Sequence, residues 1–577
     1  MAATPDAIYA EFRALDAKSK ALFLDLRDLP PHVPAAVWKP FFKRTFGVFT
    51  RLWKFQQLNR VTLEREDGGG TGLKRHEVGE TASKIGQLYY NLRSSETGYL
   101  LESYTFFEAI WDRGYFNGVM ETRVSAVAAK CLRYYARFMI VCLLLGRWDR
   151  VQVLTVEIKR YVDTYTAELD PSDVHGWLQV VKEMLIFVKT ASGSATDLIS
   201  PPKPTDSLRL PARPPSDPSA APRGSLRAAV ICGCWTAQPK FADLSIDMFR
   251  MMQLLERDPR KIPGDSFDDP DVPVKVPLFQ PSASSIVLHL ATSQKDLSAS
   301  QHMLFYFSGS GSPSPTFSSG RPGSQPSLLD LAQLGVDTKP RATSARSRRS
   351  AVFDSDDSDG GTMEVAGAKA LPPPPDPEEG ARFHLTDLMA FMRKPLVAII
   401  DSPGAHAFKR IPQLYSAPFL FMLAPQHTPP LLDERLRQRN CGSLLTLFLA
   451  QPLRTVADLL CGGSSGNGGE PATDAAMAEA STSLAQWEAD LGMALQSSAE
   501  TPESIATMLL DDHLRRLIVR FVIARITFSH SAMIIKTTEV PSFHPDLSDA
   551  LWAELQETSL AHFTKVLEHL GGQSHFR

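Results

Sequence analysis

The sequence has few cysteines, and their spacing offers no zinc or disulfide framework. Six cysteines are spread over 577 residues, and no two CxxC motifs occur together. Cys232-Gly-Cys234 is a candidate redox or metal pair, but no second pair of ligands accompanies it. Cysteine usage therefore predicts a reducing compartment, where free buried thiols are ordinary.

A segment long enough to cross a membrane is also lacking. The longest apolar run, residues 138–145, falls far short of the roughly 20 residues that span a bilayer. The N-terminal residues lack the apolar core and basic start of a secretory signal. The sequence therefore predicts an intracellular protein that does not contact membranes.

Neither sign of charge dominates the chain. Lysine and arginine total 61 and aspartate and glutamate 64, for a formal net charge of -3. No global field attracts nucleic acid or an anionic membrane. Hydrophobic residues make up 43%, enough for sizeable cores, and the length suggests roughly three or four domains.

Residues 1–193 have the periodicity of helices, with apolar residues at steps of three and four. Two paired-helix segments, residues 85–116 and 133–162, carry part of the tetratricopeptide (TPR) spacing. Small residues such as Gly86 let helices approach, and Gly146 begins a turn. We expect a TPR-like helical array here. A generic helical bundle with aromatic cores is the alternative.

A change of period from Leu226 onward predicts an α/β domain. Short β-rich runs alternate with helical segments, as in a parallel sheet with helices on both faces. The predicted strands are Leu226–Cys232, Met303–Phe307, Leu396–Ile400 and Phe419–Leu423, and the predicted helices include Leu244–Arg257 and Ser282–Gln294. The predicted organisation is a helical domain (1–193), a Pro/Ser-rich linker (194–224), an α/β domain (225–460), a Gly/Ser-rich linker (461–475) and a C-terminal helical region (476–577).

A long insertion, residues 312–380, interrupts the α/β domain. Its composition cannot bury a core, so it is predicted to be disordered. Within residues 341–360, an arginine cluster stands beside an acidic Ser/Asp run. A nuclear-import or phospho-regulated signal is one interpretation, and a solvated charge block is the other.

A glycine turn, Ser308-Gly309-Ser310-Gly311, follows the apolar run 303–307. A phosphate-binding loop would need a lysine and a helix directly after the glycines. This segment has neither, and prolines follow it. A dinucleotide-binding turn also requires a helix directly after the glycines, so this interpretation is excluded too.

The order of strands and helices over about 225 residues resembles a caspase-like peptidase. In that pattern one strand ends in the catalytic histidine and the next in the catalytic cysteine. Ser310 stands at the histidine position and Pro403 at the cysteine position, so neither base nor nucleophile is present. We predict a degenerate caspase-like domain with no catalytic, cofactor or metal residues. Another doubly wound sheet is the alternative, and a hydrolase using Ser308, Ser310 or Ser402 is the rival function.

The remaining candidate residues have ordinary explanations. His289, His406 and His427 lack a nucleophile at suitable spacing, and a single carboxylate, Asp401, does not define a metal site. The aromatic and basic stretch 39–60 permits a nucleic-acid-binding hypothesis. Its aromatics fall at helical core spacing, which favours a helix with a basic outer face, so direct nucleic-acid binding is not expected.

Long and unusual segments in both halves resemble the suppressor of cancer cell invasion (SCAI) family. The resemblance is weakest in residues 312–380 and 462–504. The segments that carry it are LFLDLRDLP (22–30), RTFGVFTRLWKFQQLNR (44–60), residues 72–107, LRYYARFMIVCLLLGRWD (132–149), KFADLSIDMFRMMQLLERDP (240–259), KPLVAIIDS (394–402) and GSLLTLFLAQPL (442–453).

The resemblance implies a non-enzymatic transcriptional cofactor of corepressor type. Animal members are described as binding a myocardin-related coactivator and as acting in double-strand-break repair with chromatin repair proteins. It further implies a nuclear location with a cytoplasmic pool. The family pattern assigns no catalytic or ligand residues to this sequence, and no cofactor is expected.

Overall fold

A computed structural model of the chain divides into two compact units. Unit 1 comprises Met1–Leu185 and unit 2 begins at Ile186, so the boundary falls within helix α8 (Val174–Ser192). The structure describes residues 4–27, 35–63, 73–92, 98–169, 171–192, 207–211, 225–235, 238–258, 272–295, 297–309, 385–457, 474–531 and 540–571. The predicted insertion at 312–380, including 341–360, lies outside them, as does the predicted linker at 461–475 except for its last two residues, which begin α15 (Asp474–Ser497).

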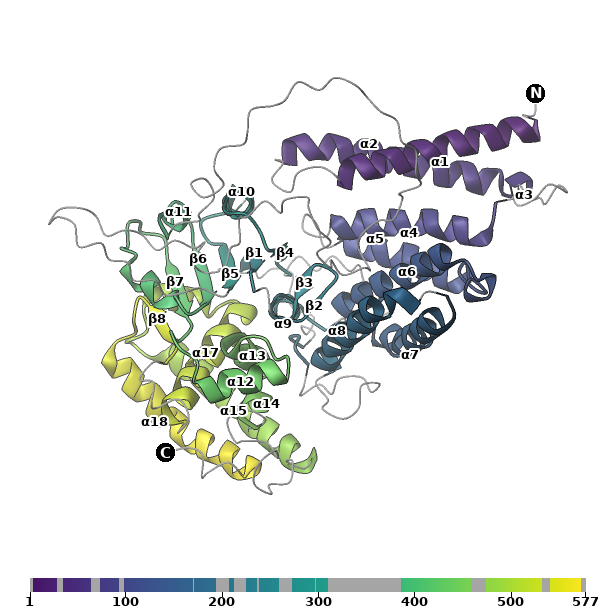
Figure 1. Ribbon diagram of the computed structural model, residues 1–577. Coiled ribbons are helices and arrows are strands. Elements are labelled where there is room, and N and C mark those ends of the chain that lie inside the picture. The colour runs from purple at the N-terminus through teal and green to yellow at the C-terminus, as the bar shows by residue number, and fades with distance from the viewer. Residues whose placement is uncertain are drawn as a thin grey trace, which may run out of the picture. The chain divides into compact units, whose positions relative to one another are not determined.

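Unit 1 is an array of helices that pack on one another in series (Figure 1). Contacts join α1 to α2, α2 to α4, α4 to α5, α5 to α6 and α6 to α7. The helices are α1 (Pro5–Arg27), α2 (Ala35–Leu58), α3 (Arg60–Leu63), α4 (Arg75–Asn91), α5 (Gly98–Asp112), η1 (Met120–Thr122), α6 (Ser125–Leu145), α7 (Trp148–Thr164), η2 (Tyr165–Leu169) and η3 (Pro171–Asp173), followed by the start of α8.

Small residues let α4 and α5 approach closely. A Cβ built on Gly86 would lie 2.8 Å from Cε1 of Phe107, closer than real side chains pack. The Ser103 hydroxyl crosses the same interface and donates to the Gly86 carbonyl at 2.8 Å. Gly146 ends α6 with a φ of 67°, a conformation that favours glycine. The predicted helical array is confirmed, while its TPR-like character stays a prediction.

Unit 2 is built on a six-stranded sheet in the order β4-β1-β5-β6-β7-β8. All neighbours pair in parallel except β7 and β8, which are antiparallel. The predicted parallel sheet is confirmed for its five parallel strands, while the antiparallel β8 was not predicted. Four strands lie at or within one residue of the predicted limits. The strands are β1 (Leu226–Gly233), β4 (Val274–Phe279), β5 (His302–Ser308), β6 (Leu396–Asp401), β7 (Phe419–Leu423) and β8 (Ser542–His544), beside a small hairpin of β2 (Lys240–Phe241) and β3 (Leu244–Ser245).

Helices cover both faces of this sheet. In Figure 1, α10 and α11 lie on one side of the strands and α9, α13 and α17 on the other. The helices of unit 2 are α9 (Ile246–Leu254), α10 (Ala283–Lys295), α11 (Leu385–Met389), η5 (Ala405–Arg410), α12 (Pro430–Gln438), α13 (Leu444–Ala450), α14 (Pro452–Thr455), α15 (Asp474–Ser497), α16 (Glu503–Met508), α17 (Asp512–His530) and α18 (Asp549–Leu570).

The parallel strands, numbered in chain order, follow the doubly wound order 2-1-3-4-5. This arrangement is compatible with both predicted alternatives, so the caspase-like assignment stays a prediction. The order reverses between β1 and β5, and ligands of doubly wound sheets bind at such a point beside the carboxyl ends of the strands.

The C-terminal region belongs to unit 2, and the segment between its last two helices supplies one strand of the sheet. Strand β8 extends the sheet beyond β7, and Phe543 of β8 packs on Phe521 of α17 with ring centroids 4.6 Å apart. Residues 207–211 of the predicted linker also pack against this unit. Leu210 forms a parallel bridge with Arg257, and Arg516 donates to the Leu208 carbonyl at 2.9 Å.

Among the residues that the structure describes, no helix is both long enough and apolar enough to span a membrane.

Candidate functional site

The carboxyl edge of the sheet brings the ends of β5 and β6 together. Ser308 and Asp401, the last residues of these strands, are paired in register. The next amide, that of Gly309, donates to the Asp401 carbonyl at 3.2 Å. The two strand ends that a caspase-like active site would need are therefore adjacent.

Asp247, in the first turn of α9, is the centre of a buried polar cluster at this edge. Its side chain is fully buried and forms an ion pair with Arg250 at 3.1 Å. One carboxylate oxygen accepts hydrogen bonds from the Ser443 amide at 3.0 Å and the Ser308 hydroxyl at 3.3 Å. The amide of Gln238 donates to the same oxygen. Asp247 therefore connects α9, the end of β5 and the segment before α13.

Asp401 supports the N-terminus of α13. The Ser443 hydroxyl donates to its carboxylate, and the Thr446 amide donates to the same oxygen at 3.0 Å. The Thr446 hydroxyl also bonds to Asp401 and lies 2.6 Å from the Tyr306 hydroxyl. Free amides at a helix start favour a negative charge, which explains why a strand-end carboxylate sits here.

Burial raises the pKa of both carboxyl groups. Desolvation is the main cause for Asp401, the nearby Asp247 charge adds to it, and the pKa reaches about 6. Burial also raises the pKa of Asp247, while Arg250 opposes that shift. Raised carboxyl pKa values are typical of active sites and also of buried structural networks.

The segment Cys441–Ser443 fills the position where a doubly wound sheet would receive a ligand. Gly442 has a φ of +75°, and a Cβ there would lie 2.3 Å from Oδ1 of Asp247. The Cys441 carbonyl accepts a hydrogen bond from Arg250. Both carboxylates of the cluster thus have their hydrogen bonds from the chain itself, while Nε of Arg250 and Oε1 of Gln238 have no hydrogen-bond partner among the described residues.

The predicted site residues are only partly brought together. Ser310 lies outside the described residues. Pro403 is half-buried in the turn after β6. Ser308 is fully buried, and Ser402 is 2% exposed with a hydroxyl that has no hydrogen-bond partner among the described residues.

The candidate histidines do not converge on these serines. His406 and His427 are exposed, and neither contributes a hydrogen bond to the Asp247 and Asp401 cluster. His289 is partly buried in α10, and burial lowers its pKa.

Cys232 and Cys234 are buried free thiols. Burial raises the pKa of both, that of Cys234 to about 12, so neither is a thiolate at neutral pH. Among the described residues, no group of three or more histidine, cysteine, aspartate or glutamate side chains is placed to hold a metal ion.

Basic side chains of the 39–60 stretch lie on the outer face of α2 (Ala35–Leu58). Lys43, Arg44 and Lys54 are exposed, whereas Phe49 and Leu52 are buried in the core. This is the arrangement that helical core spacing predicts. Among the described side chains of α2, Phe41 is the one exposed aromatic, so they form no row of rings for base stacking.

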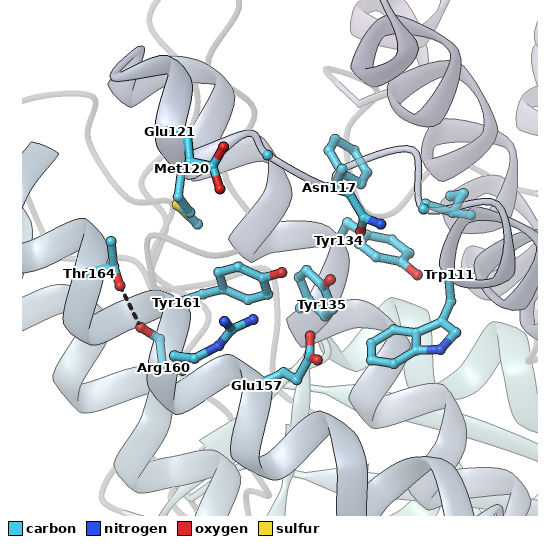
Figure 2. A pocket seen from close by; sticks show the side chains of 14 residues that line it. Trp111, Asn117, Met120, Glu121, Tyr134, Tyr135, Glu157, Arg160, Tyr161 and Thr164 are labelled. Atoms are coloured by element: carbon cyan, nitrogen blue, oxygen red, sulfur yellow. Dashed lines mark hydrogen bonds between the residues drawn. The ribbon is translucent and has the colours of Figure 1, made fainter.

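Unit 1 contains a pocket of about 620 Å³, shown in Figure 2 and named here the aromatic pocket. It lies among α5, α6, α7 and the turn between α5 and α6. Its lining comprises Ile110, Trp111, Gly114, Phe116, Asn117, Gly118, Met120, Glu121, Tyr134, Tyr135, Glu157, Arg160, Tyr161 and Thr164.

Aromatic rings form the floor and walls of this pocket. Tyr135 is the buried floor. Trp111 packs on it edge-on at 5.8 Å between centroids, and Tyr161 packs on it at 5.0 Å. Burial raises the pKa of Tyr135 and Tyr161, so both rings are neutral at physiological pH.

Two glycines shape the turn that completes the pocket. Gly114 and Gly118 have φ values of +58° and +74°, which other residues rarely adopt. A Cβ on Gly114 would lie 2.4 Å from the Asn117 side chain. The sequence WDRGYFNG carries this signal, but the pocket itself depends on three helices and was not predicted.

Comparison with known proteins identifies the family of the chain. The sequence profile of the family described as "Protein SCAI" matches residues 14–271 and 265–534. The chain belongs to the SCAI family, which confirms the resemblance noted in its sequence. No solved structure matches it.

Relatives cover nearly the whole chain. "Protein SCAI" of Homo sapiens is 33% identical over 549 residues, which is 92% of this chain and 83% of that protein. The mouse protein is 32% identical over the same shares. "Protein SCAI homolog" of Dictyostelium discoideum is 27% identical and covers 91% of this chain and 85% of its own length.

Proposed function

We propose that the chain is a non-enzymatic transcriptional cofactor of corepressor type that acts in the nucleus through protein–protein contacts. The observation that carries the proposal is family membership along both units. The implied partners are transcription factors or coactivators, of the myocardin-related type in animals, and a cytoplasmic pool accompanies the nuclear one.

The closed state of the sheet edge supports a non-enzymatic role. Asp247 is fully buried and Asp401 is 5% exposed, so a substrate in solution reaches neither carboxylate. Their hydrogen bonds hold α9 and α13 in place. The cluster therefore acts as a structural junction within the α/β unit.

The helical array supports a role in binding. Arrays of stacked helices offer extended surfaces for peptides, and unit 1 carries an aromatic pocket of a size that ligands and side chains occupy. A contribution to double-strand-break repair through chromatin repair proteins is part of the same proposal. It rests on the family resemblance alone.

The proposal is tested by keeping the full chain out of the nucleus. The chain is fused to a nuclear export signal and expressed in cells depleted of the native protein, with transcripts measured genome-wide. A fusion to an inactivated export signal is the control. We expect the control to restore the transcript pattern and the exported chain to fail.

Proximity labelling by the control fusion identifies neighbours in the same cells. We expect proteins of the transcription machinery and chromatin. Equal rescue by both fusions, or neighbours that are exclusively cytoplasmic, would show that the protein does not act in the nucleus.

A further inference from the structure

The aromatic pocket combines rings with carboxylates that have no ion-pair partner. Glu157 on α7 and Glu121 in the turn both line it, and neither forms an ion pair with any described residue. Glu80, by contrast, forms ion pairs with both Lys84 and Lys130. The pocket thus places two unpaired carboxylates beside the half-buried rings of Trp111 and Tyr161.

We propose that this pocket binds a lysine or arginine side chain presented by a protein partner. The proposal rests on the protein-binding role above and specifies the chemistry that the bound segment must carry. The ring faces attract the cation, and the free carboxylates pair with it.

The geometry of the rings fits this occupant. Trp111 and Tyr161 are half-buried on either side of the floor formed by Tyr135, so each leaves part of its ring open to the pocket. Cations bind within about 6 Å of a ring centroid, most strongly over tryptophan. Figure 2 shows Tyr161 and Glu157 reaching the same hollow from α7.

The chain already places one cation on this surface. The guanidinium of Arg160 lies 4.8 Å from the centroid of the Tyr161 ring. Arg160 is exposed, so its side chain competes with an incoming cation for one ring while leaving Trp111 open. Removing its charge should therefore strengthen cation binding, whereas removing the Glu157 charge should weaken it.

The test uses the full chain and small defined probes. Saturation-transfer NMR measures binding of Nα-acetyl methylamides of lysine, trimethyllysine, arginine, norleucine and glutamate. Norleucine has the apolar shape of lysine without its charge. We expect the three cationic probes to bind and to weaken with added salt, and norleucine and glutamate to bind at least several-fold more weakly.

Two charge variants give opposite expected signs. Glu157→Gln should weaken the cationic probes roughly two- to fivefold, as for loss of a partly exposed ion pair. Arg160→Gln should strengthen them roughly two- to fivefold by freeing a ring. Glu102→Gln is the matched control, because Glu102 is an exposed acid on α5 that does not line the pocket.

Three outcomes would overturn the proposal. Equal binding of norleucine would define an apolar side-chain pocket. Glutamate binding that Arg160→Gln abolishes would define an anion site. Absence of binding by every probe to folded protein would show that the pocket takes no such group. Each outcome leaves the nuclear-export experiment unaffected, so failure here is distinct from failure of the proposed function.

Discussion

Asp247 and Asp401 are joined through one residue, Ser443, whose amide donates to the first carboxylate and whose hydroxyl donates to the second. Two buried acids from different elements thereby fix the start of α13. The stability of the α/β unit should therefore depend on pH through these acids. It should also be sensitive to substitutions that disturb the segment before α13.

Replacing Asp401 with asparagine should flatten the pH dependence of stability. Burial raises the pKa of Asp401 from 3.8 to about 6, so between these values the native state holds a proton that the unfolded chain releases. The free energy of unfolding therefore falls as pH rises from about 4 to about 6. The pKa difference of Asp401 between the native and the unfolded chain corresponds to a fall of about 3 kcal/mol in the free energy of unfolding.

The measurement is hydrogen exchange of β5 and β6 amides in wild type and Asp401→Asn across this range. Asp243→Asn is the control, since Asp243 is exposed and has a positive φ that asparagine tolerates. If the stability of wild type and of Asp401→Asn changed with pH in the same way, Asp401 would not be the group with the raised pKa.

Gly442→Ala should destabilise unit 2 more than Gly571→Ala does. Both glycines have positive φ, but a Cβ at 571 meets nothing within 4 Å, whereas at 442 it meets Asp247. The shared conformational term is about 1–2 kcal/mol, and the clash adds to it only at 442. Urea unfolding of the two variants measures the difference in their stability. Equal midpoints would show that segment 441–443 accommodates the added methyl group without loss of stability.

A fluorophosphonate probe should not label Ser308 or Ser402 of the folded chain. Ser308 is fully buried and Ser402 is 2% exposed, so neither hydroxyl is open to an electrophile in solution. Mass spectrometry of the treated protein checks this, beside a known serine hydrolase. Labelling that Ser402→Ala abolishes would replace the cofactor proposal with the hydrolase hypothesis.

DNA binding through α2 should be weak and should not depend on its basic face. The exposed side chains of Lys43, Arg44 and Lys54 are changed together to glutamine, and anisotropy of a labelled duplex is followed at about 50 mM and about 200 mM salt. We expect wild type and variant to match. A steep loss of affinity with salt in wild type alone would support the nucleic-acid hypothesis.

The buried strands could be predicted because they are continuous apolar runs. All seven residues of β5 and all six of β6 are buried, which is typical of a parallel sheet covered on both faces. Strand β4 was missed because it lies at the edge, is half-exposed and contains Pro277. The three residues of β8 are too few to show a period.

The polar junction could not be predicted from local sequence. Asp247 and Ser443 are separated by 196 positions, and their contact depends on how α9 and α13 pack on one face. The aromatic pocket has the same origin, since Trp111, Tyr135 and Tyr161 come from three helices. Each residue alone has the spacing of an ordinary core position.

The placement of β8 and α17 has a consequence for synthesis on the ribosome. The first residue of β1, Leu226, donates its amide to Asp511, which lies 285 positions later and caps the N-terminus of α17. The last strand of the sheet ends at His544. The α/β unit cannot complete its hydrogen bonding until nearly the whole chain has emerged. A nascent chain halted before Asp511 exposes the strands of a partial sheet, which makes late truncations candidates for chaperone capture rather than for partial activity.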